Sequence, residues 1–152
     1  MLSIEMLLQT RKLILRAVSG LSEEAYFTIP PGFDNNIAWN VGHIIVTQQL
    51  LLYRLSGLPM YVSREQVALF RSGTSPADWS QPPEMAELLD QLSSYPQKLV
   101  DDVQAGKFQA YQAYTTSTGV NLNTFEEAVA FNYFHEGLHL GAILSLKNLV
   151  VV

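Results

Sequence analysis

The chain has 152 residues, enough for one domain with a substantial core. Apolar residues make up 48% of it and charged residues 15%, which is typical of a compact globular protein and excludes a disordered one. The formal net charge of −5 argues against nucleic acid or an anionic membrane surface as a partner. Because the chain has no cysteine, disulfides, thiolate metal sites and cysteine nucleophiles are excluded, and any metal must use nitrogen and oxygen ligands.

The beginning of the chain lacks the pattern of a secretory signal, because charges at Glu5, Arg11 and Lys12 interrupt it. Polar residues also interrupt the longest apolar stretches, so we expect no transmembrane helix. These features predict a single domain over residues 1–152 and a cytoplasmic location.

Apolar residues recur at helical spacing in four segments, which predicts an all-α fold with four main helices. The expected helices cover residues 3–19, 35–56, 82–105 and 124–148. Asn35 or Asn36 can cap the second of them, and Thr124 opens a capping box for the fourth. Pro96 lies inside the third and is expected to kink or interrupt it.

Two connections contain more than a simple turn. Residues 57–81 include a short amphipathic helix at about 63–71, and a connection of this length favours a crossover between the second and third helices. Residues 108–122 are rich in Tyr, Thr and Gln, and we expect an extended segment there that forms a short strand pair.

The chain contains three histidines, and all of them lie in strongly apolar helical segments. His135 and His139 are four residues apart, so their rings lie on one face of the fourth helix, one turn apart. His43 lies in the second helix. Neutral imidazoles bind divalent transition metals, and three of them leave a coordination position open, as in catalytic zinc sites. The alternative is that they are core histidines, hydrogen-bonded to backbone or hydroxyl groups.

The acidic residue between the paired histidines gives the pattern His-Glu-x-x-His, in which Glu136 is a candidate general base. We favour a simpler interpretation, a solvated or interhelical charge, because no further histidine follows downstream. Asn40 and Asn132 each precede a histidine by three residues, on the same helical face. Each is either an outer-shell partner of a ligand ring or an ordinary polar residue of the helix.

The segments Trp39-Asn-Val-Gly-His43-Ile and Phe134-His135-Glu-Gly-Leu-His139-Leu-Gly resemble the two histidine motifs of the DinB-like superfamily. The resemblance covers nearly the whole chain. It implies a four-helix bundle in up-down-down-up order, with the long connection between the second and third helices as the crossover. It also implies one divalent metal, most often nickel or zinc, bound by three histidines that map onto His43, His135 and His139.

The same resemblance points to a metal-dependent enzyme acting on a small molecule, such as a transferase or isomerase that uses a low-molecular-weight thiol. It also points to a homodimer. Two alternatives stay open at this stage. One is a non-catalytic metal-binding or stress-related bundle, in which a filled, dry core would surround the histidines. The other is a metallohydrolase with Glu136 as the base.

Overall fold

The computed structural model describes residues 4–150, and the described chain is mainly helical, as predicted. Its α-helices are α1 (Ile4–Val18), α2 (Glu23–Phe27), α3 (Ile37–Gln48), α4 (Arg64–Phe70), α5 (Met85–Gln104) and α6 (Phe125–Val150). A π-helical turn (Gln49–Tyr53) and a 3₁₀ turn (Arg54–Ser56) extend α3, and a second 3₁₀ turn covers Pro76–Asp78. The two-residue strands β1 (Tyr114–Thr115) and β2 (Asn121–Leu122) pair antiparallel, within the segment predicted to be extended.

Side-chain caps account for several helix boundaries. The Asn36 side chain accepts a hydrogen bond from the Trp39 backbone N–H and so caps α3. Ser63 caps α4 in the same way, through the N–H of Gln66. At the start of α6 the Glu127 N–H donates to the Thr124 hydroxyl. These caps satisfy N–H groups that lack a partner within the helix, which is why short polar residues could locate the helix starts.

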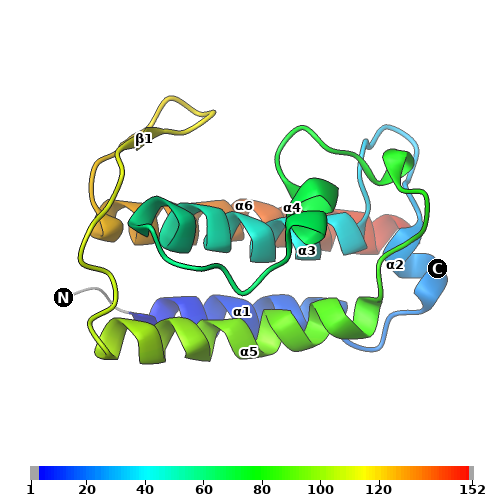
Figure 1. Cartoon of the computed structure of the whole chain (residues 1–152). Helices are drawn as coiled ribbons and strands as arrows, with labels where there is room; N and C mark the ends of the chain where they lie inside the picture. The colour runs from blue at the N-terminus through cyan, green and yellow to red at the C-terminus, as the bar shows by residue number, and fades with distance from the viewer. Residues whose placement is uncertain (1–3, 151–152) are drawn as a thin grey trace.

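The four long helices form two layers, with α1 beside α5 in one and α3 beside α6 in the other (Figure 1). The most extensive helix contacts join α1 to α5 and α6, and α3 to the same two helices. One core residue from each helix is almost completely buried where they meet: Ile14, Ile44, Leu92 and Ile143. No helix in residues 4–150 is long and apolar enough to cross a membrane.

Pro96 does not interrupt the third long helix, because α5 is continuous from Met85 to Gln104. A proline in a helix removes one backbone hydrogen bond and crowds the preceding turn. In α5 the buried side chains of Leu92 and Leu99 lie before and after Pro96 and hold both halves of the helix against the core. The expectation of an interruption is therefore wrong, since packing outweighs the local cost.

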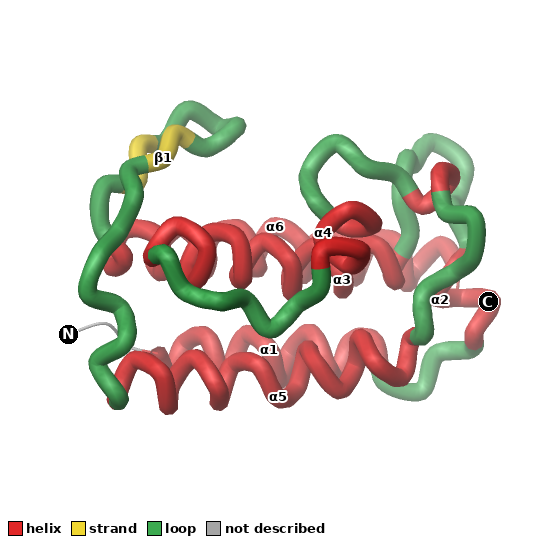
Figure 2. Tube along the Cα trace, viewed as in Figure 1, coloured by secondary structure: helices red, strands yellow, loops and turns green. Residues whose placement is uncertain are grey.

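The long connection between α3 and α5 folds back over α3 (Figure 2), and its helix α4 packs on α3. Gly42 makes this close contact possible, because a Cβ atom at that position would overlap the aromatic ring of Phe70. Phe70 is the last residue of α4 and is almost completely buried. The absence of a side chain at Gly42 therefore sets how closely the two helices approach.

We predict that Gly42→Ala destabilises the protein by about 1–3 kcal/mol, because the added methyl group overpacks the contact with Phe70. Gly137→Ala is the matched control: it lies in α6, where a Cβ would meet no other atom. That control is expected to be neutral or to stabilise by up to about 1 kcal/mol, since alanine favours helix over glycine. Chemical denaturation of both variants measures the difference, and equal effects would contradict the prediction.

Candidate metal centre

The structure brings the three histidines together, because α3 and α6 pack side by side. One ring nitrogen from each of His43, His135 and His139 lies within 4.8 Å of the others. The Nε2 atoms of His43 and His135 are 3.1 Å apart. Imidazole nitrogens on one tetrahedral zinc ion, each at 2.0–2.1 Å from it, are separated by about 3.4 Å. The cluster therefore has the dimensions of a site that could hold a single metal ion.

A backbone carbonyl orients the ring of His43. Its Nδ1 atom lies 2.7 Å from the carbonyl oxygen of Phe70, at the C-terminal end of α4. A carbonyl oxygen only accepts hydrogen bonds, so Nδ1 carries the proton and Nε2 keeps its lone pair. The ring also stacks on Trp39, with the ring centroids 4.5 Å apart. Both contacts direct Nε2 of His43 toward the other two histidines.

An asparagine on the neighbouring helix orients His139. The Nδ1 atom of His139 lies 2.8 Å from Oδ1 of Asn40. The orientation of the Asn40 amide is itself fixed, because its Nδ2 donates to Oδ1 of Asn35 and to the backbone oxygen of Asn36. His139 therefore donates from Nδ1 and keeps the lone pair on Nε2. Asn40 therefore has the outer-shell role expected for it. It orients His139 on α6, however, and not His43, which follows it by three residues in α3.

The ring of His135 is placed by packing. Its Nδ1 atom is buried and has no hydrogen-bond partner among residues 4–150. The ring stacks at 6.4 Å on Phe131, one turn earlier in α6. The amide nitrogen of Asn132 donates to Glu136, 2.8 Å away, and Asn132 makes no hydrogen bond to a histidine ring among residues 4–150. Asn132 therefore does not orient a ligand ring.

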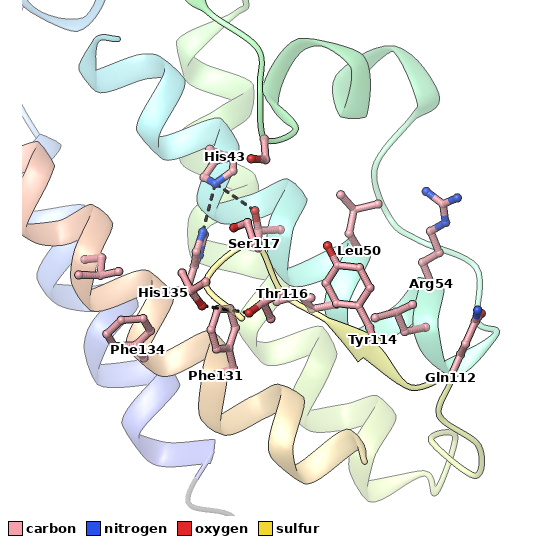
Figure 3. Close-up of a pocket in the computed structure, with 16 residues that line it drawn as sticks. His43, Leu50, Arg54, Gln112, Tyr114, Thr116, Ser117, Phe131, Phe134 and His135 are labelled. Atoms are coloured by element: carbon pink, nitrogen blue, oxygen red, sulfur yellow. Dashed lines mark hydrogen bonds between the residues drawn. The ribbon is translucent and has the colours of Figure 1, made fainter. Parts of the chain in front are cut away.

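A cavity of about 450 Å³ opens beside the cluster, with His43 and His135 in its wall (Figure 3). The wall comes from α3 and the turns that extend it, from the β1–β2 hairpin and from α6. Residues 116–118 of the hairpin contribute three hydroxyl groups, and Arg54 lies at the end away from the histidines. Sequence patterns gave no signal for Arg54 or for these hydroxyl groups, because nothing local places the hairpin over α3.

The family model described as the DinB superfamily matches residues 6–143. The chain belongs to the DinB superfamily. The resemblance inferred from the histidine motifs is thus confirmed over most of the chain. A search of curated proteins found no match.

Burial keeps the three imidazoles of this DinB-superfamily protein neutral. It lowers the pKa of His135 to about 3, with smaller contributions from the nearby His139, His43 and Arg11. It lowers the pKa of His139 to about 4, helped by His43. The pKa of His43 is also lowered by burial, against the opposing effect of the hydrogen bond to Phe70. Neutral rings with Nε2 lone pairs are the form that binds a divalent metal, so this donor set fits one.

Glu136 points away from the cluster and belongs to a buried ion pair. Its two oxygens accept hydrogen bonds of 2.9 Å from Nε and Nη2 of Arg11 on α1. Both side chains are almost fully buried, with exposed fractions of 2% for Arg11 and 0% for Glu136. Glu136 does not line the cavity. It is therefore an interhelical charge, one of the forms favoured from the sequence, and this arrangement does not support a role as general base.

The buried histidines predict an acid-sensitive fold in the metal-free protein. In the unfolded chain the histidines take up protons near their ordinary pKa of about 6.5. In the folded chain the pKa is about 3 for His135 and about 4 for His139. Below about pH 6.5 the unfolded state binds more protons, so the free energy of unfolding falls as the pH drops. Urea unfolding of chelator-treated protein between about pH 7.5 and 5 measures this fall in the free energy of unfolding. This pH range lies above the one in which most carboxylates titrate, so the histidines dominate the change.

His135→Gln is the control for that titration, since it removes one of the buried bases. Its stability should fall less steeply over the same pH range. An unfolding midpoint for the original chain that does not change between about pH 7.5 and 5 would contradict the prediction.

Proposed function

We propose that the protein is a metal-dependent enzyme in which His43, His135 and His139 bind one divalent ion, with nickel or zinc as the best candidates. The observation that carries this proposal is the convergence of three neutral imidazoles beside a cavity large enough for a small molecule. Three protein ligands leave room in the coordination sphere for a further ligand. A bound divalent ion would supply Lewis acidity or lower the pKa of a bound water or thiol.

The chain's own groups have defined tasks in this proposal. The Phe70 carbonyl and the Asn40 amide hold protons on Nδ1 of two ligands, so that their Nε2 atoms stay available. The apolar helices α3 and α6 bury His43 and partly bury His135 and His139, so the ligand rings have little contact with water. The cavity provides space for a small-molecule substrate beside His43 and His135.

The reaction that we propose is a transfer or isomerisation that uses a low-molecular-weight thiol, as the superfamily resemblance implies. The cavity supports an enzyme over a non-catalytic bundle, since a filled core beside the histidines would be expected in the second case. Glu136 gives no support to a hydrolase, because Arg11 and Asn132 already engage its carboxylate.

We further propose that residues 1–152 form one domain, a four-helix bundle in up-down-down-up order. The direction of the colours in Figure 1 supports this order: α1 and α6 run one way along the bundle, and α3 and α5 run the other way. The connection that carries α4 would then be the crossover between the parallel helices α3 and α5.

We also propose a homodimer. Outside the cavity, the C-terminal half of α6 exposes large apolar side chains, Leu144 at 47% and Leu149 at 54%. Exposed apolar surface of this kind is typical of interaction sites.

Light scattering at micromolar concentration should give twice the mass of the chain, and Leu144→Lys should shift the mass toward that of a monomer. A monomeric mass for the original chain would contradict the proposal.

The metal proposal predicts that His43→Ala loses most of the bound ion, because two ligands on one helix no longer enclose it. The measurement is elemental analysis of protein purified without a metal-affinity column and equilibrated with zinc or nickel. Glu127→Gln, an exposed change near the start of α6, is the control and should keep full occupancy. Equal metal content in His43→Ala and the original chain would contradict the three-histidine site.

The same assay tests the orientation of His139. Asn40→Ala removes the acceptor for its Nδ1 proton and should weaken metal affinity by about 10- to 100-fold. Asn132→Ala is a matched control, because it removes another buried asparagine that contacts Glu136 instead of a histidine. Similar losses in both variants would show that the effect is general destabilisation.

A further inference from the structure

We propose that the cavity beside the histidines takes a small amphiphilic carboxylate, with Arg54 as the residue that binds the carboxylate. This inference rests on the proposed function, because it treats the cavity as the substrate site. It adds the chemical class of the substrate and a specificity-determining residue. Three observations carry it: the position of Arg54, the charges around the cavity and the chemistry of its walls.

Arg54 and the histidine cluster lie at opposite ends of one helical face. His43, Thr47, Leu50 and Arg54 all line the cavity, and their spacing keeps them on one side of α3 and its extension. At 1.5 Å per residue, the backbones of His43 and Arg54 are on the order of 15 Å apart along the axis. In Figure 3, Arg54 lies beside Gln112, on the side of the cavity away from His135. A ligand reaching both ends must therefore be elongated.

The charge on Arg54 is not neutralised by the protein. No side-chain hydrogen bond or ion pair of Arg54 occurs within residues 4–150, although the chain as a whole carries a net charge of −5. No described Asp or Glu lines the cavity, and Arg54 is its only described lysine or arginine. The Arg54 side chain is exposed, so its guanidinium is open to an incoming ligand, and no described carboxylate of the cavity wall competes with an anion there. Its planar fork fits a carboxylate.

The wall between the two ends is mainly apolar. Leu50, Leu51 and Leu55 line one side, and Phe131, Phe134 and Leu138 of α6 line the other. Phe134 and Leu138 are each 54% exposed, so a ligand could cover apolar surface that is otherwise in contact with water. A fully hydrophilic anion such as inorganic phosphate would gain nothing from these apolar walls. A carboxylate with a hydrocarbon body would contact both the Arg54 guanidinium and the apolar walls.

The test compares octanoate with octanamide, which share a hydrocarbon body and differ in charge. Both are titrated by calorimetry into the full chain, once after chelator treatment and once after zinc loading. We expect the metal-free protein to bind octanoate about tenfold more tightly than octanamide, as a charge-assisted hydrogen bond to arginine provides. The metal-free arm matters because a carboxylate could otherwise bind to the metal ion.

Arg54→Met keeps the apolar stem and removes the charge, so it should abolish the preference for octanoate. Arg64→Met makes the same change in net charge on α4, outside the cavity, and should keep the preference. A preference for octanoate that survives in Arg54→Met would overturn the proposal. For the original chain, the proposal would be overturned by equal binding of octanoate and octanamide, or by no octanoate binding at millimolar concentration. His43→Ala separates the two proposals: if it binds no metal but still prefers octanoate, the carboxylate site stands whatever becomes of the metal proposal.

Discussion

The hydrogen bond between His139 on α6 and Asn40 on α3 is the contact on which the candidate metal centre depends. It joins the two helices that supply the histidines, and it fixes which nitrogen of His139 carries the proton. Asn40 is held in turn by Asn36, whose side chain also caps α3. The residue that starts the helix therefore also helps to orient a ring on another helix, so the start of α3 and the geometry of the cluster cannot vary independently.

The rotation of α6 about its own axis is a second constraint, and the apolar pattern alone does not fix it. One side of α6 buries Ile143 and Leu146, yet the opposite side exposes Phe134 and Leu138. The buried pair of Glu136 with Arg11 distinguishes the two sides, because a wrong rotation would leave both charges without a partner. A buried ion pair adds little net stability after desolvation, but breaking it is costly. We infer that its role here is to fix the orientation of α6, and with it the adjacent His135.

The sequence was informative wherever the determining interaction is local. Helix starts followed from caps such as Asn36 and Thr124, and the pairing of His135 with His139 followed from helical spacing. The convergence of His43 needed a hypothesis about packing as well as spacing. The Phe70 carbonyl could not be predicted, because every residue has a carbonyl group and only the approach of α4 at Gly42 selects this one. The partner of Glu136 was equally hidden, since Arg11 lies 125 residues away in the chain.

The walls of the site come from elements with different tertiary support. The histidines project from long helices whose core residues are almost fully buried, whereas the hydroxyl groups of residues 116–118 belong to a hairpin with only two paired positions. A hairpin this short contributes little stability of its own and depends on anchors such as the buried Leu122. Changes in residues 116–118 can therefore alter the wall of the cavity while the contacts that orient His43 and His139 remain. In this arrangement the selection of a substrate is separable from the binding of a metal, because no residue that orients a histidine ring lies in the hairpin.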